Sequence, residues 1–219
     1  MVKDGHTASV LGIGEDSKKV ILEDNGVQLI RLPKPISPVA RYIENFIRIN
    51  KELKRIQKTT AIDIVETSEL DCAYLPKNTL YKKVIEEKTP LLGICLGAQM
   101  LGNKSEEGTE KGLAWIDMDV VKFDTKKLSN NLKVPHMNWN EINIKKTTPL
   151  FNKLNNQSRF YFVHTYHMQT NNPTDVLCTS NYGYEFVSGV HKNNIWGMQF
   201  HPEKSHKFGM KLLENFAAI

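Results

Sequence analysis

The chain of 219 residues (25.0 kDa) is 40% hydrophobic and 24% charged, which is typical of a globular protein with one domain of ordinary size and an extra segment. It has no apolar run of about 18 residues or more, the length that a membrane-spanning helix needs. The net charge of +5 would suit a nucleic-acid partner, but the lysines are interspersed with acids, as over 82–88, which favours solvated surfaces over a binding patch.

The first third of the sequence predicts alternating strands and a helix. Apolar runs at 9–13, 27–32 and 61–65 predict strands. Ser37 and Pro38 are typical of a helix start, and the helix they predict lies between the last two strands. A strand, a crossover helix and another strand imply a parallel sheet with a right-handed connection.

The segment Gly93-Ile94-Cys95-Leu96-Gly97 lies between an apolar run and a helix-like stretch over 98–101. A strand that turns sharply into a helix lifts one side chain out of the fold, and flanking glycines allow the strained backbone and leave space for a substrate. A cysteine at that position is a candidate nucleophile if a base holds it as thiolate. The pentapeptide alone is equally compatible with a buried cysteine at a tight turn.

Short apolar runs separated by polar turns follow this segment. They predict strands that form hairpins added to a parallel core, at 120–123, 141–144, 160–164, 187–190 and 195–200. A helix over 208–218 is predicted to close the chain, with its apolar residues largely on one face.

The last predicted strand ends in His201-Pro202-Glu203. In an extended segment, residues two apart lie on the same side, so we expect the side chains of His201 and Glu203 to lie together. A histidine needs such an orienting acceptor to act as a base toward a thiol. Cys95, His201 and Glu203 are therefore a candidate nucleophile, base and orienting acid.

Four segments carry a family resemblance. Residues 90–99 and 197–205, which hold the three candidate residues, resemble the class I glutamine amidotransferases. Residues 134–140 and 161–167 are similar to the glutaminase subunit of imidazole glycerol phosphate synthase. The resemblance implies an α/β fold, an open and mostly parallel sheet flanked by helices, with added antiparallel hairpins.

The resemblance covers about residues 84–219 and leaves 1–83 as an α/β segment of atypical sequence. Residues 1–80 are weakly similar to the N-terminal part of a glycosyltransferase. A fusion near 77–85 and a divergent amidotransferase N-terminus both explain this difference.

The family resemblance also implies roles for individual residues. Cys95 attacks the glutamine amide, His201 acts as base and then as acid, Glu203 orients His201, and the N–H of Leu96 donates to the oxyanion. The expected substrate contacts are Gln99, Glu107, Thr165, Tyr166 and His167. Without the resemblance, Gln99 would be interpreted as an ordinary first-turn residue and Tyr166 as a core aromatic.

A glycine-rich loop that supplies the family's second oxyanion donor has no counterpart here. The nearest segment, Tyr74-Leu75-Pro76, contains no glycine. Loss of one such donor typically costs about 2.7–4 kcal/mol, so we expect a weakened enzyme. The two other cysteines, Cys72 and Cys178, lie in strand-like or loop contexts and are interpreted as structural.

By resemblance, the partner is a TIM-barrel cyclase in a heterodimer, and neither a cofactor, a metal, nucleic acid nor a membrane is expected. Met137 and Trp139 lie in what is predicted to be an exposed turn facing that partner. The alternative for Trp139 is that it packs on its own core. The absence of an apolar signal core and the odd number of cysteines favour the cytoplasm.

The predicted function is hydrolysis of glutamine to supply ammonia to a partner synthase, whose lyase chemistry makes imidazole glycerol phosphate in histidine biosynthesis. One alternative is a paralogous glutaminase that supplies ammonia for amidation of a surface-polysaccharide sugar, which the N-terminal segment suggests. The other is an amidotransferase relic without catalytic activity.

Overall fold

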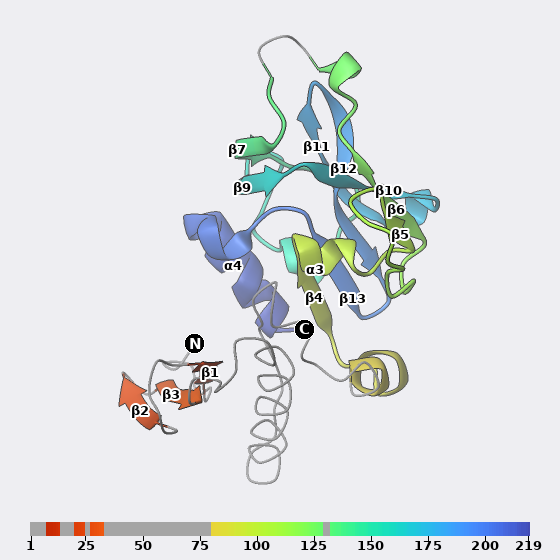
Figure 1. Cartoon of the computed structure of the whole chain (residues 1–219). Helices are drawn as coiled ribbons and strands as arrows, with labels where there is room; N and C mark the ends of the chain where they lie inside the picture. Colours follow the sequence, from red (N-terminus) through yellow and green to blue (C-terminus); the bar gives the residue numbers. More distant parts are fainter. Residues whose placement is uncertain (1–7, 14–19, 25–26, 33–79, 129–131) are drawn as a thin grey trace. The chain divides into compact units, whose positions relative to one another are not determined.

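The computed structural model describes residues 8–13, 20–24, 27–32, 80–128 and 132–219 (Figure 1). The chain divides into two compact units, Met1–Leu80 and Tyr81–Ile219. The strand predicted at 61–65, the helix predicted after Ser37, Cys72 and the segment 74–76 lie outside the described residues. Within the described ranges, no helix has the length and apolar character needed to cross a bilayer.

The described part of the first unit is a three-stranded sheet. β1 (Ala8–Ile13) pairs in parallel with β3 (Val27–Leu32), and β2 (Val20–Asp24) pairs antiparallel to β3. The strands predicted at 9–13 and 27–32 are confirmed. β2 was not predicted.

An eight-stranded mixed sheet forms the centre of the second unit (Figure 1). Its strands are β4 (Leu91–Ile94), β5 (Lys104–Ser105), β6 (Met118–Lys122), β8 (Asn143–Ile144), β10 (Tyr166–Thr170), β11 (Val176–Tyr182), β12 (Tyr184–Lys192) and β13 (Ile195–Met198). The order is β4-β13-β12-β10-β6-β5, with β11 paired to β12 and β8. The α/β fold class is confirmed.

Antiparallel pairs outnumber parallel ones among the described strands of this sheet. Only β4–β13 and β5–β6 are parallel. Adjacent strands such as β11 and β12 are joined by a turn at Gly183, and so short a connection permits only an antiparallel pair. The predicted hairpins therefore make up most of the described sheet, which is mixed and not mostly parallel as predicted.

The other predicted strands of the second unit are confirmed except at one place. The prediction of one strand over 141–144 is wrong. β7 (His136–Glu141) ends at the first residue of that range, and β8 begins only after the buried Ile142. β7 pairs with β9 (Arg159–His164) in a separate two-stranded sheet, while β8 pairs with β11. The chain changes sheets at this point, which a run of apolar residues does not indicate.

Four helical segments flank the strands or connect them at places that matter for the site. They are a π-helical turn (Lys82–Glu86), α3 (Leu96–Gln99), a 3₁₀ turn (Pro202–Lys204) and α4 (His206–Ala217). α4 confirms the predicted closing helix, and it packs its buried Leu212 into a core that includes Phe160 and Phe200, stacked with ring centroids 4.2 Å apart.

α4 lies unusually close to the loop that precedes it. A Cβ atom on Gly209 would overlap the carbonyl oxygen of Pro202, so only glycine permits this approach. At the other end of the helix, the Asn215 side chain donates to the carbonyls of Leu150 and Asn152, at 2.9 and 2.7 Å. The approach at Gly209 places the start of α4 against Pro202, and the bonds of Asn215 hold the end of the helix against the segment 150–152.

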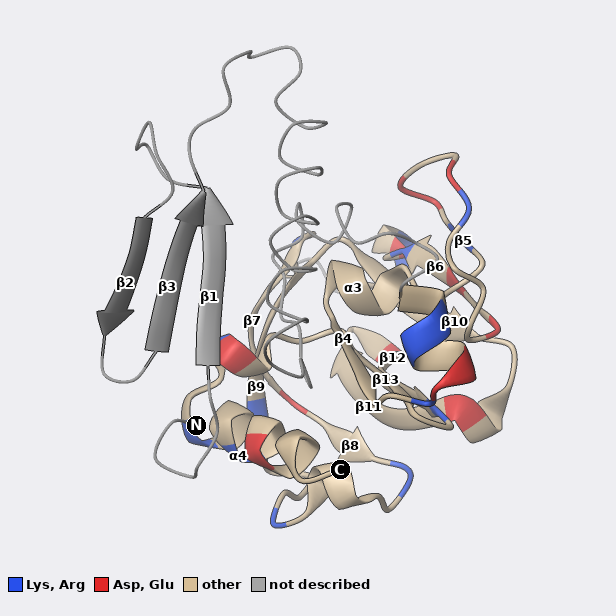
Figure 2. Ribbon diagram, turned by 90° about the horizontal axis from the view of Figure 1, so that it is seen from below, with Lys and Arg blue, Asp and Glu red and all other residues tan. Residues whose placement is uncertain are grey.

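Charges of both signs occur on the same elements of the second unit (Figure 2). Exposed lysines pair with nearby acids, for example Lys83 with Glu87 at 2.7 Å and Lys145 with Glu185 at 3.1 Å. Such exposed pairs contribute little to stability. They agree with the interpretation of the lysines as parts of solvated surfaces.

Candidate active site

Cys95 occupies a strained turn between β4 and α3. Its φ of 52° and ψ of −111° lie in a region that residues with a side chain rarely adopt. The Cys95 N–H donates to the carbonyl of Met198 at 2.7 Å, so the turn is fixed to the end of β13 (Figure 1). The predicted elbow is confirmed in geometry, although the helix spans Leu96–Gln99 rather than 98–101.

The two glycines that flank Cys95 have different roles. A Cβ on Gly93 would lie 2.7 Å from the carbonyl oxygen of Gly97, so the strand and the helix meet only because this residue is glycine. A Cβ on Gly97 would meet no atom of another described residue within 4 Å. Gly93 therefore closes the elbow, and Gly97 leaves a position beside Cys95 that none of the described side chains fills.

His201 and Glu203 are brought together by a turn. The His201 Nδ1 lies 2.7 Å from Glu203 Oε1, so this nitrogen carries the proton that the carboxylate accepts. The prediction of an extended segment through Glu203 is wrong, because Pro202–Lys204 forms a 3₁₀ turn whose first position suits proline. The expected pairing of the two side chains is nevertheless confirmed.

The electrostatics of this cluster favour a protonated His201. The neighbouring Cys95 thiol, and next the Glu203 carboxylate, raise the pKa of His201 to about 9. Burial raises the pKa of Glu203, but the hydrogen bond from His201 lowers it, and the net change is a decrease. The His201 Nε2 is buried and forms no hydrogen bond with any described residue, which leaves it free to exchange a proton with the thiol.

Two glutamine side chains connect the elbow to its surroundings. The Gln99 Nε2 donates to the Tyr166 carbonyl at 3.1 Å and to Gln199 Oε1 at 3.0 Å. The Gln199 Nε2 in turn donates to Cys95 Sγ at 3.8 Å. Gln199 is completely buried and was not singled out in the sequence. The signal that could have found it is an amide residue inside the apolar run Met198-Gln199-Phe200, because a buried amide needs partners.

Thr165 and Tyr166 lie at the bend between β9 and β10, near the elbow. The Thr165 carbonyl accepts from the Phe123 N–H at 3.2 Å. The Tyr166 carbonyl accepts from Gln99, and its side chain is half-buried. Of these two residues, Tyr166 is the one that described hydrogen bonds connect to Cys95, through Gln99 and Gln199.

His167 and Glu107 have no described contact with the elbow. His167 is buried, with Nε2 3.0 Å from the Tyr184 hydroxyl and Nδ1 3.1 Å from the Met168 carbonyl, and burial lowers its pKa. Glu107 is exposed in a turn, where its N–H donates to Ser105 Oγ at 3.1 Å. Their roles toward a substrate stay predictions.

Met137 and Trp139 lie on strand β7, so the prediction of an exposed turn there is wrong. Pairing with β9, in which Trp139 lies opposite Tyr161, extends this segment. Met137 is 59% exposed. Trp139 is half-buried and stacks on His206 of α4, with ring centroids 5.3 Å apart.

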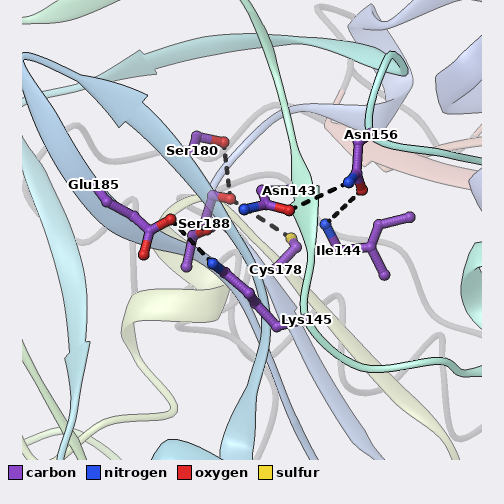
Figure 3. Close-up of polar contacts among 9 residues, drawn as sticks. Asn143, Ile144, Lys145, Asn156, Cys178, Ser180, Glu185 and Ser188 are labelled. Carbon is purple, nitrogen blue, oxygen red and sulfur yellow. Dashed lines mark hydrogen bonds and ion pairs between the residues drawn. The ribbon is translucent and has the colours of Figure 1, made fainter.

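Cys178 lies apart from this cluster, at a junction of β8, β11 and β12 (Figure 3). Its sulfur lies 3.5 Å from the Ser188 hydroxyl, and burial raises the pKa of the thiol to about 12. The protonated, inaccessible thiol agrees with a structural role. Among the described residues, no group of three or more His, Cys, Asp or Glu side chains is placed to hold a metal ion.

The chain is similar to known proteins over most of its length. The family model "Glutamine amidotransferase class-I" matches residues 69–219, and so begins ahead of the boundary predicted at 84. The imidazole glycerol phosphate synthase subunit HisH 2 of Pseudomonas aeruginosa is 49% identical over 142 residues, which cover 65% of this chain and 69% of the relative. The subunit of the same name from Methanococcus maripaludis is 56% identical over 137 residues, covering 63% and 66%.

A third relative matches over more of the chain. The synthase subunit HisH of Pelagibacter ubique is 36% identical over 197 residues, which cover 81% of this chain and 93% of the relative. Among solved structures, a putative GMP synthase subunit from Thermoplasma acidophilum has a TM-score of 0.49 and 18% identity, covering 97% of this chain and 94% of that one.

Proposed function

The chain belongs to the class I glutamine amidotransferase family, and from this premise we propose that it is the glutaminase subunit of an imidazole glycerol phosphate synthase. It hydrolyses glutamine to glutamate and ammonia, and the ammonia serves histidine biosynthesis. The three relatives found by sequence are described as subunits of that synthase, which supports this pathway over amidation of a surface-polysaccharide sugar. The observation that carries the proposal is a cysteine in a strained elbow next to a histidine that a carboxylate orients.

The first half-reaction uses the thiol and the imidazole. His201 Nε2 holds the proton that the Cys95 thiol gives up, as the raised pKa of His201 favours, and the thiolate attacks the amide carbon of glutamine. The C–N bond then breaks as His201 returns the proton to the leaving nitrogen, which departs as ammonia. Glu203 accepts from Nδ1 throughout and stabilises the imidazolium.

The second half-reaction releases glutamate. His201, neutral again, takes a proton from water, and the water oxygen attacks the thioester carbon. The C–S bond breaks, and the thiolate regains a proton from His201. No cofactor is needed, because every bond made or broken involves only the thiol, water and glutamine.

The oxyanion of each tetrahedral intermediate needs donors near Cys95. We assign the N–H of Leu96 to this role because the first N–H groups of a helix have no carbonyl within the helix to donate to. The segment 74–76 contains no glycine, so we expect no second oxyanion donor from it and therefore a weakened activity. A single donor is expected to support turnover on the order of 100- to 1000-fold slower than two.

The substrate is proposed to lie in the open space beside Gly97. That position adjoins Cys95, and a Cβ atom there would meet no atom of another described residue within 4 Å. Gln99 and the Thr165–Tyr166 bend border the elbow and are proposed to contact the α-amino and α-carboxylate groups of glutamine. The same role for Glu107 and His167 is supported by family resemblance only.

The ammonia requires an acceptor, and the relatives are named as subunits of a synthase, so the proposal includes a partner synthase. We propose a TIM-barrel cyclase that docks on the β7 face, where Met137 is exposed and Trp139 half-exposed. The reaction and its free thiol suit the reducing cytoplasm.

The test is a coupled measurement of glutamate release. The purified chain is assayed with glutamine, alone and with a cyclase subunit from the same genome, and Cys95→Ala serves as the inactive control. Glutamate release that depends on Cys95 and rises with the cyclase supports the proposal. Complete inactivity in the presence of a bound cyclase would instead identify an amidotransferase relic.

A further inference from the structure

Two buried histidines connect β7 to the candidate active site. His136 on β7 and His164 at the end of β9 are 1% and 6% exposed, and His136 Nδ1 lies 3.0 Å from His164 Nε2. On its other side, His164 Nδ1 lies 2.8 Å from the Tyr166 carbonyl. This is the same carbonyl that accepts from Gln99.

The direction of every bond in this series follows from one carbonyl. The Tyr166 oxygen can only accept, so His164 Nδ1 carries a proton. Burial lowers the pKa of His164 to about 3, which keeps the ring neutral and leaves its Nε2 as an acceptor. His136 Nδ1 must therefore donate to it. Both rings are then Nδ1–H tautomers, the less common form of a neutral histidine in water.

The contacts of His136 at the other end of the series agree with the same assignment of tautomers. His136 is neutral as well, because burial lowers its pKa to about 4, and its Nε2 is left as an acceptor. The Asn140 Nδ2 lies 3.4 Å from that Nε2 and also donates to the Asn181 carbonyl at 2.8 Å. All donors and acceptors in the series are therefore compatible with one another.

The aromatic surroundings restrict the His136 ring to one orientation. The ring stacks on Tyr182 and on Phe162, with centroid distances of 4.0 and 4.9 Å. Because the surroundings are apolar, hydrogen bonds there are electrostatically stronger, and an unpaired donor would be costly. The ring cannot rotate without disturbing two aromatic contacts and its bond to His164.

We propose that His136 and His164 are positioning residues for the nucleophile. They fix the position of the Tyr166 carbonyl, which accepts a hydrogen bond from Gln99. Gln99 in turn donates to Gln199 and orients it, and the Gln199 amide donates to the Cys95 sulfur. The series begins on the strand that also carries the exposed Met137. A partner that shifts β7 thus changes the hydrogen bond to the nucleophile, a consequence that rests on the proposed function.

The tautomers give a direct test on the unsubstituted protein. Nitrogen-15 NMR of the imidazole rings in the full chain is expected to show Nδ1 protonated and Nε2 unprotonated in both His136 and His164. Assignment uses the loss of each signal set in single variants. A protonated Nε2 on His164 would break the series at its centre and overturn the proposal.

The effect on the nucleophile is measured as the alkylation rate of Cys95 by iodoacetamide, which needs neither glutamine nor a partner. His164→Phe removes both bonds of the ring, and we expect the rate to change by about 2- to 30-fold, the range typical of substitutions along a coupled network. His164→Asn keeps an amide donor near the position of Nδ1 and is expected to restore a rate close to that of the unsubstituted chain. A merely structural role would not give this rescue.

His191→Phe is the matched control. His191 is also stacked on an aromatic ring, that of Trp196 at 4.6 Å, but belongs to no part of the series, so the alkylation rate is expected to stay unchanged. A folded His164→Phe that is alkylated at the unsubstituted rate overturns the proposal. If that variant does not fold, the tautomer measurement decides. If the chain lacks glutaminase activity but gives these results, the proposed function is contradicted, whereas the positioning role of His136 and His164 is still supported.

Discussion

The backbone carbonyl of Tyr161 accepts a hydrogen bond from the backbone N–H of His201 at 2.9 Å. Tyr161 also lies opposite Trp139 in the β7–β9 pair, with ring centroids 6.0 Å apart. The candidate base is thereby connected to β7 through β9. Cys95 is connected to the same strand by a different series of hydrogen bonds, which runs through Gln199, Gln99, Tyr166 and the two histidines. Both reacting side chains therefore depend on the strand whose outer face carries Met137.

We predict that Cys95 is the cysteine modified by a diazo-ketone analogue of glutamine. Its elbow position and the adjacent His201 make it reactive, whereas Cys178 is completely buried and its pKa is raised to about 12. Peptide mapping by mass spectrometry after labelling measures this. Modification of Cys72 or Cys178 with Cys95 untouched would refute the assignment of the nucleophile.

A pair of glycine substitutions separates closure of the elbow from access to it. Gly93→Ala places a Cβ 2.7 Å from a backbone oxygen, so we expect a loss of about 1–3 kcal/mol of unfolding free energy. Gly97→Ala places a Cβ that meets no atom of another described residue within 4 Å, and it should leave stability within about 1 kcal/mol. It nevertheless fills the proposed substrate space, and we expect a raised KM for glutamine. Denaturant titration and steady-state kinetics distinguish the two effects, and equal stability losses would contradict the assignment.

The raised pKa of His201 predicts how stability depends on pH. Its folded value of about 9 exceeds the ordinary 6.5, so its stabilising contribution is fully present below pH 6.5 and is lost as pH rises through about 9. We expect the unfolding free energy to fall by up to about 3 kcal/mol across this window, as measured by urea denaturation.

Two variants attribute this pH dependence to its causes. Cys95→Ala removes the larger influence on the pKa of His201, and Glu203→Gln removes the next. We therefore expect the decrease to be reduced in both variants, and more strongly in Cys95→Ala. The same decrease in all three proteins would show that another group titrates.

Local patterns in the sequence predicted the elbow and the His201–Glu203 pair, because both depend on residues close together in the chain. The contacts of Gln199 and the pair His136–His164 could not be predicted in this way. They depend on the registers of β4 with β13 and of β7 with β9, which join distant segments. The change of sheets between β7 and β8 was missed for the same reason. Tertiary pairing, not the apolar pattern, decides where such strands end.

The isolated chain is predicted to have very low glutaminase activity. The predicted lack of a second oxyanion donor and the dependence of both reacting residues on β7 each point to activation by a partner. Glutamate release is measured before and after addition of the cyclase. Turnover of glutamine at rates on the order of 10 per second, a typical enzyme value, in the isolated chain would contradict both arguments.

Trp139→Ala is predicted to weaken association with the cyclase by about 2 kcal/mol or more, the effect of an interface hot spot. Because Trp139 also stacks on His206, with rings inclined by only 7°, its removal affects the chain's own packing as well. Calorimetric titration measures the affinity, and circular dichroism measures whether the variant is folded. Loss of fold before loss of binding would show that Trp139 is a core residue.

Met137→Ala separates docking from packing, because Met137 is 59% exposed on the same strand. A surface substitution of this kind changes stability by no more than about 0.5 kcal/mol, so any loss of affinity reports on the interface alone. We expect weaker binding of the cyclase with an unchanged thermal unfolding curve. If Met137→Ala and a folded Trp139→Ala both bind the cyclase as tightly as the unsubstituted chain, the partner docks elsewhere. The exposed methionine would then be an isolated apolar residue of the kind that most protein surfaces carry.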